Sequence, residues 1–294
     1  MRCWTRWKVN SEMGRFPKRI IVTGGLGFIG SNFIHHLIQK YTTHNEMAYL
    51  SDREKYPSSE LVSDLEILNI DKVTYAGNFE NLAGVTDFSG YSFEKADIAD
   101  SEKMARIFSE FRPECVVHFA AESHVDRSID SGNQFILTNV LGTQVLLEAS
   151  RSVGLDLFVH VSTDEVYGST TEGSFSETSN LRPSSPYSSS KAASDLVALS
   201  HFHTYGTPVI VTRCTNNFGP RQHCEKLVPK VITNAKNEEI IPVYGSGLQI
   251  RDWIHVSDHV SGIISVSCGS VGLSQLNQST LKHNILIKVF IIIK

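Results

Sequence analysis

The chain has 294 residues, of which 41% are hydrophobic and 20% are charged. This balance is ordinary for a soluble protein with one large domain, or with a large domain and a smaller lobe. The net charge of −4 and the lack of a long basic run argue against a nucleic-acid partner. The five cysteines are scattered without Cys-x-x-Cys spacing, so we expect a cytoplasmic protein without a metal site and without a membrane partner.

Residues 1–17 are rich in basic side chains and contain no apolar stretch of signal-peptide length. A short organellar transit segment is one interpretation, and a disordered tail is the one that we favour.

A strand predicted at 19–22 runs directly into a glycine-rich turn, and an apolar-periodic helix follows it. Gly24, Gly27 and Gly30 allow a tight turn and a close approach of a pyrophosphate to backbone N–H groups. The pyrophosphate would then lie at the positive end of the helix dipole. The order of strand, glycines and helix therefore predicts a dinucleotide site.

The second strand is predicted at 65–70 and ends at Asp71, an acid that can accept hydrogen bonds from a ribose 2′-OH and so select NAD. Asp71 lies 41 residues after Gly30, whereas about 20 is usual. Residues 42–64 are polar and are interpreted as a surface insertion. Asp52 is a rival acid, but no good strand precedes it.

Strands and helices continue to alternate along the chain. Strands are predicted at 91–98, 115–119 and 157–161, helices at 102–111 and 133–153, and a turn at 120–126 whose alanines suit a flat cofactor. This alternation predicts an α/β fold, a Rossmann-type doubly wound parallel sheet with right-handed crossovers.

Polar residues with catalytic potential follow the strand at 157–161. Thr163, Asp164 and Glu165 lie at its carboxyl end, where open α/β sheets bind ligands. Tyr187 and Lys191 are four residues apart, so a helix places them on one face. A lysine ammonium there lowers the pKa of the tyrosine and makes it a general base. Taken alone, such a pair is also common on solvated helices.

The remainder is predicted to hold a helix to residue 205, a strand at 209–213, a polar turn at 215–220, a helix beginning at 225 and a short strand at 240–245. Arg251 and Lys226 are natural counter-ions for a diphosphate, although each taken singly also suits a solvated surface.

Eight segments together resemble the extended short-chain dehydrogenase/reductases, and within them the nucleotide-sugar 4,6-dehydratases. The matching segments are 23–30, 71–78, 120–128, 162–168, 185–191, 216–220, 225–229 and 249–253. They occur in the right order over about residues 18–266.

The resemblance implies a reaction on dTDP-glucose that yields a 4-keto-6-deoxy sugar. Tyr187, helped by Lys191, would take the 4-OH proton while hydride passes to NAD, and Thr163 would steer that hydroxyl. Glu165 would remove the C5 proton, and protonated Asp164 would donate to the leaving 6-OH. These opposite tasks require separated pKa values in the carboxyl pair.

The resemblance also implies binding residues and a homodimer formed through helices near 133–153 and 186–205. The implied NAD-binding residues are Gly24, Gly27, Phe28, Ile29, Gly30, Asp71, Lys72, Val73, Thr74, Asp97, Ile98, Ala120, Ala121, Glu122, Thr138, Tyr187, Lys191 and Asn217. The implied nucleotide-sugar residues are Ser123, Thr163, Asn216, Lys226, Leu227, Pro242, Val243, Tyr244 and Arg251.

The domain organisation that follows is an NAD-binding domain at 18–212, a partial sugar-nucleotide-binding lobe at 213–266 and a divergent tail at 267–294. The tail no longer resembles the family and ends in an apolar, β-rich run, so we expect a truncated form with an incomplete C-terminal lobe. A UDP-glucose dehydratase, a nucleotide-sugar 4-epimerase and an inactive NAD-binding homologue remain alternatives. The acid pair Asp164 and Glu165 favours the dehydratase over the epimerase, which needs no group to expel water.

Overall fold

The computed structural model describes residues 17–51, 65–171, 173–243, 246–271 and 289–291. Within these ranges, parallel strands form one sheet in the order β3-β2-β1-β4-β5-β6-β9. Their bounds are β1 Arg19–Thr23, β2 Glu66–Asp71, β3 Tyr91–Lys95, β4 Cys115–His118, β5 Leu157–Thr163, β6 Val209–Cys214 and β9 Val289–Ile291. The order proceeds outward from β1 in both directions, which confirms the predicted doubly wound sheet.

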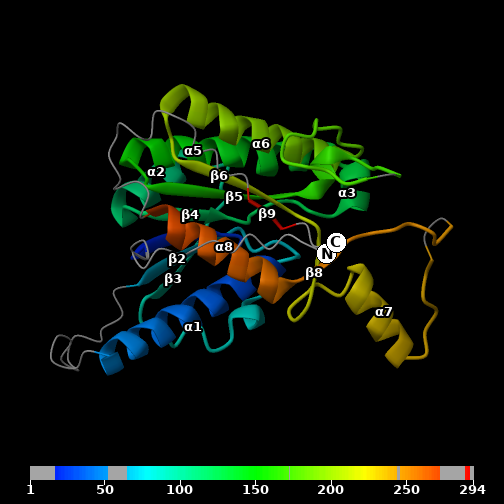
Figure 1. The fold of residues 1–294 in the computed structure, drawn as a ribbon, viewed down its shortest axis with the longest axis horizontal. Coiled ribbons are helices and arrows are strands. Elements are labelled where there is room, and N and C mark those ends of the chain that lie inside the picture. Colours follow the sequence, from blue (N-terminus) through cyan, green and yellow to red (C-terminus); the bar gives the residue numbers. More distant parts are fainter. Residues whose placement is uncertain (1–16, 52–64, 172, 244–245, 272–288, 292–294) are drawn as a thin grey trace.

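Helices cover both faces of this sheet (Figure 1). Helices α1 (Phe28–Ser51) and α8 (Val256–Val271) pack against each other on one face. The other face carries α2 (Ser101–Phe111), α5 (Gly142–Val153) and α6 (Pro186–Tyr205). Two separate apolar clusters fill the layers between sheet and helices, one on each face. The near-continuous apolar strands are therefore buried on both sides, as a parallel sheet requires.

The helical stretch predicted at 133–153 forms as three consecutive pieces. These are α4 (Gly132–Phe135), the π-helical turn η3 (Ile136–Leu141) and α5. A preceding short helix, α3 (Val125–Asp130), leads into them. Because π-helical turns often occur at functional sites, the position of Thr138 within η3 agrees with its predicted place at the cofactor.

Helix α6 begins where the sequence predicts because its first turn is capped twice. The Ser185 side chain accepts a hydrogen bond from the Ser188 backbone N–H at 3.0 Å, and the Ser188 hydroxyl lies 2.9 Å from the Ser185 backbone nitrogen. Pro186 occupies the first helical position, where its missing N–H costs nothing. This capping box holds Tyr187 in the first turn of the helix.

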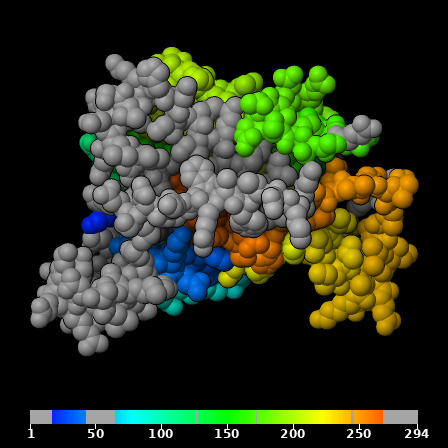
Figure 2. All heavy atoms as spheres, viewed as in Figure 1, coloured from blue at the N-terminus to red at the C-terminus, as the bar shows by residue number. Residues whose placement is uncertain are grey.

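The chain after β6 differs most from the expectations. Part of the predicted polar turn forms β7 (Asn216–Phe218), which pairs with β8 (Trp253–His255) in a separate two-stranded sheet. Helix α7 spans Leu227–Lys236. The short strand predicted at 240–245 is wrong for 240–243, where Ile240 is 90% and Val243 is 72% exposed and no partner strand lies alongside. Figure 2 shows α7 and the segment after it, in yellow and orange, projecting beside the main body.

The two predicted peripheral segments are only partly described. Helix α1 continues to Ser51, so the first part of the proposed insertion extends a helix, whereas 52–64 lie outside the described residues. The predicted disordered tail, apart from Pro17, also lies outside them. Near the C-terminus, three residues of the apolar run form β9, whose backbone pairs with β6. Within the described ranges, no helix combines the length and hydropathy needed to span a bilayer.

Candidate active site

A cavity of about 500 Å³ lies at the carboxyl ends of the parallel strands, among the turns that follow β1, β4, β5 and β6. Most of the residues that the sequence singled out line it. They are Gly24, Gly27, Phe28, Ile29, Gly30, Asp71, Lys72, Thr74, Asp97, Ile98, Ala120, Ala121, Glu122, Ser123, Thr138, Thr163, Glu165, Tyr187, Lys191, Asn216, Asn217, Lys226, Leu227 and Arg251. Segments separated by more than two hundred residues therefore meet at one site.

The glycine turn after β1 forms the floor of the cofactor end. Gly24 has φ +74°, and a Cβ there would come within 2.6 Å of the Ala120 nitrogen. A Cβ at Gly30 would collide with the Gly24 carbonyl oxygen. Helix α1 then begins at Phe28 with its N-terminus at the cavity. Backbone and helix dipole thus form a cradle that fits a dinucleotide pyrophosphate.

Two acids flank this cradle. Asp71, at the end of β2, accepts hydrogen bonds from the backbone nitrogens of Leu26 (3.1 Å) and Val73 (2.8 Å). Burial raises the pKa of Asp71, and these two hydrogen bonds oppose the change. The Asp97 carboxylate accepts from the Ala99 nitrogen at 3.0 Å and pairs with Lys72 at 2.5 Å. Both carboxylates retain acceptor capacity for ribose hydroxyls, since each oxygen offers two lone pairs.

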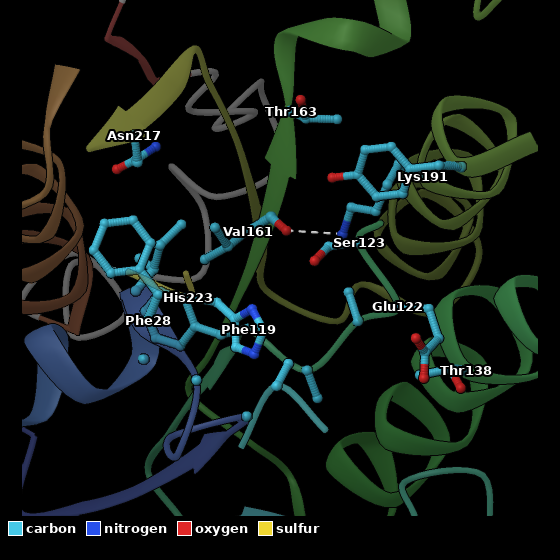
Figure 3. A pocket seen from close by; sticks show the side chains of 18 of the residues that line it. Phe28, Phe119, Glu122, Ser123, Thr138, Val161, Thr163, Lys191, Asn217 and His223 are labelled. Atoms are coloured by element: carbon cyan, nitrogen blue, oxygen red, sulfur yellow. Dashed lines mark hydrogen bonds between the residues drawn. The ribbon is translucent and has the colours of Figure 1, made fainter. Parts of the chain in front are cut away.

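The hydroxyl, phenol and ammonium groups of the predicted redox set converge on the cavity from β5 and α6. Thr163 is the last residue of β5, and its Oγ1 accepts from the Glu165 nitrogen at 3.2 Å. The Lys191 ammonium is buried and donates to the Val161 carbonyl at 2.9 Å, which Figure 3 marks with a dashed line. The lysine is thereby tied to the strand that carries Thr163.

The ionisation of Tyr187 differs from the expectation. The pKa of Tyr187 is raised rather than lowered, although Lys191 lies one helical turn away. Burial raises that pKa strongly, and the carboxylates of Glu165 and Asp164 add to the rise, while a hydrogen bond with Thr163 opposes it. Burial also lowers the pKa of Lys191 to about 8. The reason is that helical spacing predicts a neighbour, but it does not predict how much desolvation the tertiary fold imposes on both groups.

The predicted acid pair lies in the short turn η4 (Asp164–Tyr167). Burial raises the pKa of both Asp164 and Glu165, and the adjacent Asp164 raises that of Glu165 further. Glu165 lines the cavity, whereas Asp164 is not among the lining residues and accepts a hydrogen bond from the Thr163 hydroxyl at 3.4 Å. Raised values keep a carboxylic acid able to donate a proton, as the predicted role of Asp164 requires.

The predicted diphosphate end is completed by residues from α7 and the segment before β8. Lys226, which precedes α7, donates to the Ser123 carbonyl at 3.2 Å, and Asn216 donates to the Asp252 carbonyl at 3.2 Å. Arg251 lines the same end. Positive side chains thus face the space that the predicted diphosphate would fill.

Four of the predicted site residues that the structure describes do not line the cavity. Asp164 is one of them, and Val73 packs its side chain against a core cluster. Pro242 and Val243 belong to the exposed segment after α7, which forms no strand to carry them inward. Tyr244 lies outside the described residues.

The cavity also contains residues that the sequence did not single out as functional. Glu225 lies between two imidazoles, with its carboxylate 3.5 Å from His124 Nε2 and 3.6 Å from His223 Nδ1. Cys214 and Thr215 line the wall at the end of β6. Their position directly after a predicted buried strand was the available signal. No group of three potential metal ligands occurs within the described part of the chain.

Comparison with known proteins places this site within a family. The profile of the NAD dependent epimerase/dehydratase family matches residues 20–267. The dTDP-glucose 4,6-dehydratase of Neisseria meningitidis serogroup B is 45% identical over 260 residues, which cover 85% of this chain and 67% of that relative.

Solved structures agree. The dTDP-glucose 4,6-dehydratase DesIV of Streptomyces venezuelae, a double mutant solved with NAD, is 40% identical with a TM-score of 0.75, covering 93% of this chain and 84% of that one. The UDP-glucose 4-epimerase of Thermotoga maritima is 30% identical with a TM-score of 0.69, covering 82% and 71% respectively. The chain therefore belongs to the NAD dependent epimerase/dehydratase family.

Proposed function

We propose that the protein is an NAD-dependent dTDP-glucose 4,6-dehydratase, a hydro-lyase of nucleotide-sugar metabolism. The observation that carries this proposal is the position of Glu165. It lines the same cavity as Tyr187 and Lys191, and Asp164 is its neighbour in the chain. A redox set and a buried acid pair at one site support oxidation followed by elimination of water.

The residues act in the following order. Tyr187, with Lys191 beside it, takes the proton of the sugar 4-OH, and Thr163 orients that hydroxyl. NAD, when bound, supplies the redox chemistry by accepting a hydride from C4 and returning one to C6. Glu165 removes the C5 proton, which the 4-keto group has made acidic. Asp164 protonates the 6-OH, and the C6–O bond breaks to release water. Return of the proton to C5 completes the 4-keto-6-deoxy product.

NAD fits the cofactor end of the cavity. Gly24, Gly27 and Gly30 would hold the pyrophosphate at the N-terminus of α1, and Asp71 would accept from the adenosine ribose. Ala120 and Ala121 leave a flat wall between the glycine turn and Tyr187. We extend the binding assignment to the other predicted NAD residues that line the cavity. The nucleotide sugar would occupy the end formed by Ser123, Asn216, Lys226, Leu227 and Arg251.

The principal alternative is a 4-epimerase. The epimerase neighbour shares the fold, so the fold alone does not decide between the reactions. Its lower identity, 30% against 45% for the N. meningitidis dehydratase, and the buried acid pair of this chain both favour dehydration. UDP-glucose is the alternative substrate, because the described residues at the base end do not discriminate thymine from uracil.

We infer that the enzyme is a cytoplasmic homodimer, with an NAD-binding domain at 18–212, a sugar-nucleotide lobe at 213–266 and a tail at 267–294. Exposed apolar side chains on η3 and α6 support the dimer. Ile136, Leu137, Leu141 and Leu196 are between 44% and 57% exposed on the outer face of the two neighbouring helices. Apolar patches of this kind mark interaction surfaces.

The decisive experiment incubates the purified chain with dTDP-glucose and follows the loss of water by mass spectrometry, with UDP-glucose in parallel. We expect water loss with dTDP-glucose, and none from a Tyr187→Phe variant that still binds NAD. Conversion to an isomer of unchanged mass would show an epimerase. A folded, NAD-loaded chain without turnover would refute the activity and favour an inactive homologue.

A further inference from the structure

One buried arginine, Arg213, contacts a residue on each of the two elements that carry the proposed catalytic groups, helix α6 and the turn η4. Arg213 lies on β6 and is 6% exposed, and its backbone stands opposite Ser162 in the register with β5. Its Nε donates to Asp195 Oδ2 at 2.7 Å, and its Nη1 donates to the Tyr167 hydroxyl at 2.7 Å. Arg213 does not line the cavity, and both of its hydrogen bonds go to the buried groups Asp195 and Tyr167.

The first contact reaches the helix of the redox pair. Asp195 is fully buried on α6, one helical turn after Lys191 and two turns after Tyr187. Its second carboxylate oxygen lies 3.3 Å from His160 Nε2 on β5, and burial lowers the pKa of this imidazole to about 4. The ion pair with Arg213 therefore ties α6 to β6 at the level of the catalytic pair.

The second contact reaches the turn of the acid pair. Tyr167 is the last residue of η4, the turn that contains Asp164 and Glu165, and it is 1% exposed. Its ring stacks on Phe175 at 5.3 Å between centroids, and the Arg213 guanidinium lies 5.1 Å from the ring centre. The same guanidinium therefore holds both η4, through Tyr167, and α6, through Asp195.

We propose that Arg213 is a positioning residue that holds the turn of Asp164 and Glu165 at a fixed distance from Tyr187 and Lys191. The planar guanidinium presents donors in a rigid fork, so its two hydrogen bonds set the separation of their partners, whereas a lysine has no such fork. Buried ion pairs often stabilise a fold no better than apolar replacements do. We therefore assign to the pair of Arg213 and Asp195 a role in fixing the position of its neighbours and not a role in stability. The inference rests on the proposed function.

Dehydration needs this fixed distance because both groups of residues work on one sugar without releasing it. The redox set acts at C4 and the acid pair acts at C5 and C6, so a displaced turn would slow elimination and leave C4 oxidation intact. Small displacements of catalytic groups have large effects on rate.

The test compares Tyr167→Phe, which removes the hydrogen bond to η4, with Asp195→Asn, which weakens the contact to α6 and also removes a negative charge that raises the pKa of Lys191. Tyr91→Phe is the matched control. The Tyr91 hydroxyl also accepts a side-chain hydrogen bond, from Asn69 at 3.0 Å, and it lies outside the cavity. Hydrogen exchange followed by mass spectrometry reports the two contacts separately, without requiring activity.

We expect Tyr167→Phe to raise amide exchange in 164–167 about tenfold, the effect of losing one charge-assisted hydrogen bond, and to leave 186–194 unchanged. Asp195→Asn should raise amide exchange in 186–194 and leave 164–167 unchanged, and Tyr91→Phe should change neither segment. On mixing with dTDP-glucose, Tyr167→Phe should accumulate reduced nicotinamide because elimination lags. Asp195→Asn should slow its appearance instead.

Unchanged exchange in 164–167 of Tyr167→Phe would overturn the inference. So would an equal loss of both chemical steps in the two variants, because that pattern indicates a merely structural role. A wild-type chain that releases no water would refute the proposed function, and the exchange comparison alone would then decide whether Arg213 holds η4 and α6 in place.

Discussion

The two ends of the cavity are built in different ways. At the cofactor end, the lining is backbone that packs directly on the sheet, with Gly24 pressed against Ala120 and Asp71 bonded to the glycine turn. At the sugar-nucleotide end, the lining comes from α7, which buries none of its residues, and from a segment where Ile250 is 91% exposed. Figure 2 shows this second region standing out from the body.

This difference makes the cofactor end rigid and the sugar-nucleotide end adaptable. The cofactor end is held by close contacts that tolerate no added atom, whereas few packed atoms hold the other end. Changes at the first end should therefore alter catalysis or folding. Changes at the second should alter affinity for the substrate.

The largest effect on activity is expected for Glu165→Gln, which changes a catalytic group next to the rigid cofactor end. The amide cannot take the C5 proton, so kcat for water loss should fall by about 10² to 10⁴, the usual contribution of a general base. Reduced nicotinamide should still form, because Tyr187 and Lys191 remain. Stopped-flow absorbance checks this expectation. A variant that loses both steps together would show that the acid pair and the redox set are not separable.

A matched pair of glycines compares the packing of the two ends directly. Gly24 (φ +74°) and Gly247 (φ +71°) share the left-handed conformation, but an added Cβ meets backbone at Gly24 and only the Val243 side chain at Gly247. Gly247→Ala should cost about 1 kcal/mol of unfolding free energy from the strained φ alone. Gly24→Ala should cost about 2–4 kcal/mol and abolish NAD binding. Equal losses in urea titrations would contradict the proposed contrast.

Arg251→Ala should affect binding rather than chemistry. Loss of a charge-assisted contact to the diphosphate corresponds to about 1.5–3 kcal/mol, so KM for dTDP-glucose should rise by about one to two orders of magnitude. The value of kcat should change less than KM, because Arg251 takes no proton or hydride in the proposed mechanism and acts on Asp164 and Glu165 only through its charge. A fall in kcat at unchanged KM would move Arg251 into the catalytic group.

The pH dependence of the rate should reflect the buried catalytic groups Lys191 and Glu165. Lys191 must be protonated to assist Tyr187, and burial lowers its pKa to about 8, so the rate should fall as pH rises through that value. Asp195 raises the pKa of Lys191, and its replacement by Asn should move this upper limb to lower pH. The acid limb should lie above the ordinary range of glutamate, because burial and Asp164 raise the pKa of Glu165. Rate profiles of wild type and Asp195→Asn give the comparison.

Sequence reasoning predicted the sheet from local patterns, and it predicted most of the cavity lining from the family resemblance together with the residues that follow the strands. Short apolar runs such as 115–119 are typical of buried strands, and residues directly after such strands meet at one edge of a parallel sheet. The same reasoning failed for 240–243, where an apolar composition suggested a strand but no strand in the described part of the chain pairs with it.

By itself, the sequence determined the order of strands and helices and the glycine turn, since these depend on spacing along the chain, and its resemblance to the family supplied the proposed catalytic side chains. Only the tertiary structure decided their electrostatics and mutual positions. The raised pKa of Tyr187 arises from burial and from carboxylates on another element. The contacts of Arg213 join residues that lie 18 and 46 positions away. Desolvation and long-range hydrogen bonds are properties of the packed chain, and no local pattern encodes them.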